Sequence, residues 1–311
     1  MKTSYDDNSI AHRMRLLLQD PQHVATLKRA TYGTALATLA ALAWMAWSHG
    51  GTDLSTSMGK TLVGGFIAAG ATALGALPAM FVRNISPRAE DIMLGFSAGI
   101  MAAASCFSLI LPGIDVASTL FGAKLPAALW VGFGVALGAL FLLLADKFIP
   151  HEHAVAGHHG PDFLHLRRVW LMVFAIALHN FPEGMAIGVG FSGNDMGVGA
   201  PLTAAIAIQD IPEGLVVAVA LRSVAYSPGI AALMGALSGL AEPIGAIIGN
   251  VLTSGFASLY PLGLGFAGGA MIWVVSHEII PETHRKGHEQ SASLGLIGGF
   301  IVMMLLDTAL G

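Results

Sequence analysis

The sequence predicts an all-α integral membrane protein, a polytopic bundle of long apolar helices. Hydrophobic residues make up 55% of its 311 residues and charged residues only 11%, whereas soluble domains carry about 25% charged residues. The mean hydropathy is +0.71, and apolar runs of about 18 residues or more, long enough to span a bilayer as a helix, recur from Ala30 onwards. The 39 glycines fit this class, because small residues let membrane helices approach closely.

We expect nine spanning segments, joined by short connections except for one long loop. The predicted segments are 30–48, 61–82, 91–111, 126–148, 169–190, 200–221, 229–251, 259–280 and 292–310. Residues 1–29 are polar, mixed in charge and unlike a cleavable signal, so we interpret them as an N-terminal tail. The loop at 149–168 is rich in histidine. It is either a weak site for divalent metal or a solvated loop of biased composition.

The basic residues predict the orientation of the chain in the membrane. With a cytoplasmic N-terminus, 13 of the 15 lysines and arginines fall in cytoplasmic segments, and only Lys60 and Lys124 fall outside. Cytoplasmic loops carry an excess of these residues. Because the number of crossings is odd, the C-terminus at Gly311 is expected on the periplasmic or extracellular side of the cell (inner) membrane.

Two near-copies of one phrase lie in the middle of consecutive predicted helices, HNFPEG in the first and QDIPEG about thirty residues later. A helix turns by about 100° per residue, so the three polar ligand-type residues of each copy share one face. They are His179, Asn180 and Glu183 in the first copy, and Gln209, Asp210 and Glu213 in the second. Antiparallel neighbours joined by a short loop meet at their middles, which predicts both triplets near the membrane midplane.

Charge determines what these residues are expected to bind. Glu242, in the next predicted helix, adds a fourth carboxylate, and these three helices contain no lysine or arginine. Buried carboxylates without a counter-ion are prohibitive, so they are either protonated or paired with a cation. Two divalent cations would balance four carboxylates. We therefore favour a binuclear metal site in which Glu183 and Glu213 bridge.

The ligand types narrow the choice of metal. The set consists of one imidazole, carboxylates and amide oxygens, and it suits Zn²⁺, Cd²⁺, Fe²⁺ or Mn²⁺ better than copper. Cys106 is the only cysteine, which excludes a cysteine cluster and an intramolecular disulfide. Pro182, Pro212 and Pro243 are expected to kink the helices beside the ligands. The competing interpretation, in which prolines only kink and polar groups only hold helices together, does not require four carboxylates.

Further polar residues predict a path on either side of this centre. On the cytoplasmic side, an exit is expected at His277, Glu278, Asp146 and His151. A solvated helix end is the alternative for the pair at 277–278, and proline at position 281 excludes the HExxH signature of a metalloprotease. On the outer side, the candidates for an entrance are Met101, Ser105, Ser108 and Asp115.

The paired motifs resemble the ZIP (Zrt/Irt-like) divalent-metal transporters, over about residues 60–311. The resemblance implies eight family helices with a histidine-bearing cytoplasmic loop after the third. The organisation is then a tail at 1–29, an extra N-terminal transmembrane helix at 30–48 and a ZIP transporter domain at 61–311. It further implies uptake of Zn²⁺ and related ions into the cytoplasm, ligands at the seven midplane positions, His277 and Glu278 near the exit path, and a homodimer.

Three classes of function compete for these features: a transporter, an intramembrane hydrolase that uses the same two metals, and a metal sensor. A hydrolase usually needs an open coordination position and a distinct acid or base, and no such signature is present. The trail of polar residues disfavours a sensor. We predict a transporter, not an enzyme, with no catalytic cofactor and no nucleic-acid partner, whose partners are divalent metal ions and the lipid bilayer.

Overall fold

Eight apolar helical spans make up the part of the chain that the structure, a computed structural model, describes: residues 53, 55–148, 161–193 and 196–310. No β-strand occurs within these residues. The spans are Ser57–Met80, Pro87–Phe121, Lys124–Ala145, Met172–Ser192, Met196–Ser223, Pro228–Thr253, Leu259–Thr283 and Glu289–Leu310. They confirm the predicted all-helical membrane class. The predicted tail, the extra helix at 30–48 and residues 149–160 of the long loop lie outside the described residues.

The helices are as follows: α3 (Ser57–Ala76), α4 (Pro87–Ala104), α5 (Leu111–Phe121), α6 (Lys124–Phe148), α7 (Pro161–Ser192), α8 (Met196–Ser223), α9 (Pro228–Ser238), α10 (Ala241–Thr253), α11 (Leu259–Val274), α12 (Ile280–Thr283) and α13 (Glu289–Leu310). A 3-10 turn, η1 (Leu77–Met80), extends α3, and the π-helical segments η2 (Ser105–Ile110) and η3 (Val275–Ile279) join α4 to α5 and α11 to α12. The hydroxyls of Thr56, Ser86 and Ser227 cap α3, α4 and α9 by accepting main-chain N–H groups of the first turn.

Two spans differ from the prediction in ways that bear on the site. The segment expected at 91–111 continues as helix to Phe121, because the π-helical turn η2 carries the chain past Pro112. The segment expected at 229–251 is broken at Gly239–Leu240 and restarts at Ala241. Glu242 therefore lies in the first turn of α10 instead of mid-helix. The break begins at Gly239, whose carbonyl would bond the N–H that Pro243 lacks, as the predicted irregularity at this proline requires.

Glycines set the closest helix contacts, which join α4 to α13, α7 to α10, α6 to α11 and α3 to α8. A Cβ atom placed on Gly99 of α4 would lie 1.9 Å from the carbonyl oxygen of Leu296, and one on Gly188 of α7 would lie 1.9 Å from that of Ala246. Side chains larger than hydrogen are thus excluded where these helices cross. Membrane helices commonly use such small-residue crossings to bring their backbones together.

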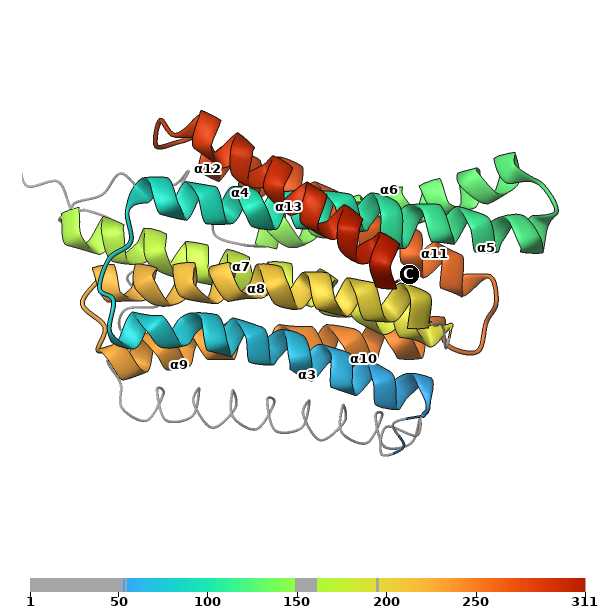
Figure 1. The fold of residues 1–311 in the computed structure, drawn as a ribbon, viewed down its shortest axis with the longest axis horizontal. Coiled ribbons are helices and arrows are strands. Elements are labelled where there is room, and N and C mark those ends of the chain that lie inside the picture. The colour runs from blue at the N-terminus through green and yellow to red at the C-terminus, as the bar shows by residue number, and fades with distance from the viewer. Residues whose placement is uncertain (1–52, 54, 149–160, 194–195, 311) are drawn as a thin grey trace, which may run out of the picture.

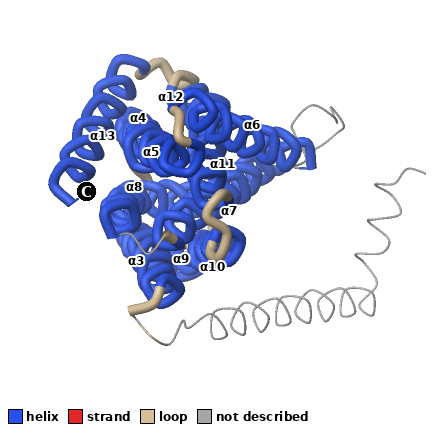
Figure 2. Tube along the Cα trace, turned by 90° about the vertical axis from the view of Figure 1, so that its right-hand side faces the viewer, coloured by secondary structure: helices blue, strands red, loops and turns tan. Residues whose placement is uncertain are grey.

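The helices form two groups when the bundle is seen end-on (Figure 2): α3, α7, α8, α9 and α10 on one side, and α4, α5, α6, α11, α12 and α13 on the other. Contacts between the groups run mainly from α7 to α11 and from α8 to α4. In Figure 1, the loops that precede α4, α9 and α13 lie at one end of the bundle, and the turn from α5 to α6 lies at the other. The two phrase-bearing helices, α7 and α8, make most of the contacts between the two groups and are therefore central to the bundle.

Candidate metal centre

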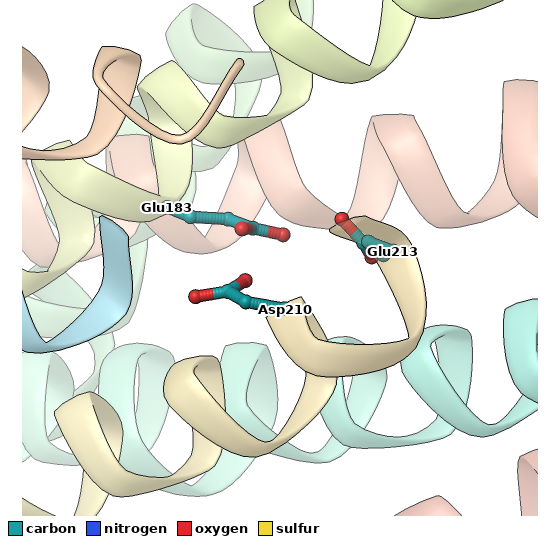
Figure 3. Close-up of side chains that lie close together, drawn as sticks. All are labelled: Glu183, Asp210 and Glu213. Atoms are coloured by element: carbon teal, nitrogen blue, oxygen red, sulfur yellow. The ribbon is translucent and has the colours of Figure 1, made fainter. Parts of the chain in front are cut away.

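Three carboxylates of the repeated phrases converge between α7 and α8. Figure 3 shows Glu183 reaching from α7 toward Asp210 and Glu213 of α8. Ligand atoms of the three side chains lie within 4.8 Å of one another, and the residues are 0%, 1% and 4% exposed. Carboxylate oxygens at such separations can share a cation. Periodicity and antiparallel packing thus place the two copies at one level, as the sequence predicts.

Two amide side chains are tied to the same region. The Gln209 amide nitrogen donates to the Oε1 atom of Glu183. Asn180 Nδ2 donates to the main-chain carbonyl of Ser238, at 3.2 Å, immediately before the break between α9 and α10. Because an amide that donates through its nitrogen leaves its oxygen available, both residues keep an acceptor for a cation.

Glu242 reaches the centre from the restarted helix α10. It is fully buried, and its Oε1 atom accepts a hydrogen bond from the hydroxyl of Thr72, on α3, at 2.8 Å. The first turn of a helix carries partial positive charge, which favours a carboxylate there. The break at Gly239–Leu240 therefore provides a place where this fourth carboxylate is tolerated.

Several buried oxygens in this cluster have no hydrogen-bond partner among the described residues. They are Asn180 Oδ1, Glu183 Oε2, Gln209 Oε1, both carboxylate oxygens of Asp210, and Glu242 Oε2. Nearly all buried polar atoms in native proteins are hydrogen-bonded, so each exception requires an explanation. Here the exceptions gather on five of the seven predicted ligand residues, the pattern expected of oxygens that receive a cation.

The charge on the cluster is also uncompensated. The four carboxylates lie close enough to repel one another electrostatically: Glu183, Asp210, Glu213 and Glu242. Within the described part of the chain, no lysine or arginine forms an ion pair with any of them. Four such groups in an apolar bundle require bound protons or a cation.

His179 has a partner that we assigned to another part of the path. Its Nε2 atom lies 2.6 Å from Oε2 of Glu278, which projects from η3. We expected Glu278 beside His277 at the cytoplasmic exit. His277 itself is exposed and stacks against Trp273, with ring centroids 4.9 Å apart. Adjacent residues of a helical turn project in different directions, and here Glu278 faces the cluster while His277 faces outward.

The remaining path residues are only partly placed. His151 lies outside the described residues, and Asp146 lies near the end of α6. Met101 and Ser108 are buried, whereas Asp115 is exposed on α5. The Ser108 hydroxyl donates to Oδ1 of Asp307 on α13, at 2.6 Å. Ser108 is thus the hydrogen-bond partner of Asp307, and the sequence alone indicates no partner for this carboxylate.

The sequence reasoning missed two hydroxyls and two glycines at the centre. Thr72 binds Glu242, and the Ser97 hydroxyl of α4 donates to the main-chain carbonyl of Gln209, at 3.3 Å. A lone threonine or serine in an apolar helix carries no recognisable signal. The two glycines could have been recognised from the sequence, since both copies of the phrase end in Glu-Gly.

The two phrase glycines admit neighbouring backbones. A Cβ atom on Gly184 would lie 2.0 Å from the carbonyl oxygen of Glu242, and one on Gly214 would lie 2.1 Å from that of Thr72. Each copy of the phrase therefore supplies a carboxylate, and the glycine that follows this carboxylate lets the backbone of another helix pack against the phrase. Gly184 seats α10, and Gly214 seats α3.

Comparisons with known proteins point to one family. Residues 150–307 match the family described as "ZIP Zinc transporter". The chain is 57% identical to the zinc transporter ZIPB of Bordetella bronchiseptica over 254 residues, which cover 82% of each chain. It is 43% identical to the zinc transporter GufA of Myxococcus xanthus, over 82% of this chain and 100% of that protein. It is also 31% identical to human zinc transporter ZIP11, over 82% of this chain and 98% of that protein.

Proposed function

Because this chain belongs to the ZIP family of metal transporters, we propose that it carries Zn²⁺ into the cytoplasm through a binuclear site at the membrane midplane. Cd²⁺, Fe²⁺ and Mn²⁺ are further candidate substrates, since the same oxygen and imidazole ligands suit them. The relatives named above are zinc transporters, which favours transport over the alternative of an intramembrane hydrolase.

The observation that carries this proposal is the group of buried oxygens without hydrogen-bond partners among the described residues. We assign seven ligands to the two ions: His179, Asn180, Glu183, Gln209, Asp210, Glu213 and Glu242. Glu183 and Glu213, at equivalent positions of the two phrases, bridge the ions. Amide oxygens are weak ligands, which suits a carrier that must release its cargo.

Uptake and stoichiometry test the proposal together. Protein reconstituted into liposomes that contain a zinc-sensitive dye is expected to take up Zn²⁺, and purified protein saturated with zinc is expected to hold two ions per chain in the membrane-embedded part. Elemental analysis of the protein measures the second quantity, with the loop histidines at 151, 153, 158 and 159 replaced so that they do not contribute. Uptake with a single ion per chain would overturn the binuclear site alone. An absence of uptake would overturn the function.

We also propose an orientation and an assembly. The N-terminus is cytoplasmic and the C-terminus periplasmic or extracellular, and two copies form a homodimer, as the family resemblance implies. Replacement of Cys106 by serine removes the only cysteine. In that background, Asn84→Cys is expected to resist an impermeant maleimide applied to intact cells, and Ala257→Cys to react with it. The reverse labelling would overturn the orientation, and a monomer mass in detergent would overturn the dimer.

We also propose which residues line the path of the metal ion into and out of the centre. We assign the entrance to Met101, Ser108 and Asp115, and the exit to His277, Glu278, Asp146 and His151. The contact between Glu278 and His179 supports an exit that begins at the metal centre itself. A metal ion that passed from the centre to this carboxylate would move toward the predicted cytoplasmic side.

A further inference from the structure

We propose that Thr72 is a positioning residue of the metal centre, which holds Glu242 so that a single carboxylate oxygen faces the metal. This inference rests on the proposed function, because it takes Glu242 as a ligand. Thr72 and Glu242 are both fully buried, and they lie on helices 170 residues apart in the sequence. No sequence motif includes Thr72.

The Thr72 hydroxyl donates to Oε1 of Glu242 and leaves Oε2 unbonded. The Thr72 hydroxyl lies 2.8 Å from Glu242 Oε1 and 3.4 Å from its other acceptor, the carbonyl of Ala68. A carboxylate oxygen is the stronger acceptor, so the proton goes to Glu242. Within the described residues, the Glu242 side chain has no second hydrogen-bond partner, and its Oε2 atom is buried and unbonded. Thr72 alone therefore determines which oxygen remains for the metal.

The packing around Thr72 restricts its side chain. A Cβ atom on Gly239 would lie 2.8 Å from the Cβ of Thr72 and 3.0 Å from its hydroxyl oxygen. On the main-chain side, a Cβ atom on Gly214, the glycine that follows Glu213, would lie 2.1 Å from the carbonyl oxygen of Thr72. Threonine in a helix divides between two rotamers. In the rotamer that the structure shows, the hydroxyl points at Glu242 and Gly239 packs against the side chain.

The same break in the α9–α10 span anchors a second predicted ligand. Asn180 donates to the carbonyl of Ser238, the residue before Gly239. The irregular turn is thus held from α3 by Thr72 and from α7 by Asn180. Metal ligands are generally oriented by such outer partners, and loss of one typically costs about 10-fold to 100-fold in metal affinity.

The test compares Thr72→Val, which keeps the shape and removes the hydroxyl, with Thr72→Ser, which keeps the hydroxyl. Zinc affinity is measured on the purified full chain by competition with a chromophoric chelator, and KM by uptake into liposomes. Thr72→Val is expected to weaken zinc binding by about 10-fold to 100-fold and to raise KM in parallel. Thr72→Ser is expected to retain the wild-type values. Equal defects in both variants would show that the hydroxyl is not the cause, and wild-type affinity in Thr72→Val would overturn the proposal.

Thr61→Val provides a matched control on the same helix. Thr61 is also fully buried, and its hydroxyl accepts a hydrogen bond from Asn250 at 2.9 Å. It lies three helical turns from Thr72. Its loss is expected to lower the melting temperature and to leave zinc affinity unchanged. An equal loss of affinity in Thr61→Val would mean that Thr72 acts only through general stability.

Two further variants keep the test decisive if Thr72→Val does not fold or if Glu242 is not a ligand. Gly239→Ala displaces the Thr72 side chain without changing it and is expected to weaken zinc binding in the same direction, so it decides the question if Thr72→Val does not fold. Wild-type affinity in Gly239→Ala would then overturn the proposal. Glu242→Ala separates this inference from the proposed function. Weak binding in Glu242→Ala with normal binding in Thr72→Val overturns the role of Thr72 alone, whereas normal binding in Glu242→Ala overturns the ligand assignment and the inference with it.

Discussion

Replacing Glu183 or Glu213 by alanine is expected to reduce zinc uptake to the level of protein-free liposomes while the protein stays folded. Each side chain is assigned to both ions, so its removal weakens the whole centre. Loss of an outer partner alone costs about 10-fold to 100-fold in affinity, and the loss of a bridging ligand is expected to exceed that. Initial rates of Zn²⁺ uptake provide the measurement.

The fold is expected to survive these substitutions for an electrostatic reason. Each variant removes one of four mutually repelling, buried carboxylates that form no ion pair with a lysine or arginine among the described residues. Alanine is also the best helix former. Glu282→Ala is the control, since Glu282 forms a surface pair with Arg285. Size-exclusion profiles should match for all variants. Wild-type uptake by both Glu183→Ala and Glu213→Ala would rule out this centre.

Replacing Gly184 or Gly214 by alanine is expected to abolish uptake as well, although neither change removes a ligand. The added methyl group would meet a backbone carbonyl of α10 or α3 at about 2 Å, and backbone cannot rotate away as a side chain can. Overpacking typically costs 1–3 kcal/mol, and the forced separation also displaces Glu242 or Thr72. Both uptake and the apparent melting temperature should fall.

Gly70→Ala is the matched control for these glycine variants. Gly70 lies within α3, and among the described residues no atom outside its own stretch of helix lies within 4 Å of the place where its Cβ would be. Alanine there is expected to stabilise the helix by up to about 1 kcal/mol, so the melting temperature should move in the opposite direction. Wild-type stability in Gly184→Ala would show that α7 and α10 do not cross as closely as described.

Much of the fold followed from local patterns. Each of the eight described spans overlaps a segment predicted from hydropathy, because the length and apolar character of a membrane helix are local properties. The meeting of the two phrases was predictable for a similar reason. Consecutive antiparallel helices bring their middles together, and Glu183, Asp210 and Glu213 do converge.

Other features depended on contacts between distant helices. The pairing of His179 with Glu278 joins residues 99 positions apart, and it depends on the π-helical turn η3. Hydropathy does not reveal such a turn. At the break before Glu242, where Pro243 has no N–H for the carbonyl of Gly239, Gly239 packs against Thr72 of a helix far away in the sequence.

The sequence by itself determined the membrane class, the eight described spans and the two phrases whose carboxylates face each other. Only the tertiary structure decided which oxygens remain unbonded, which hydroxyl holds Glu242, and why each phrase ends in glycine. The physical reason is the distance along the chain over which each effect acts. Apolar length and helical periodicity act along one helix, whereas a hydrogen bond or a glycine contact depends on how two helices cross.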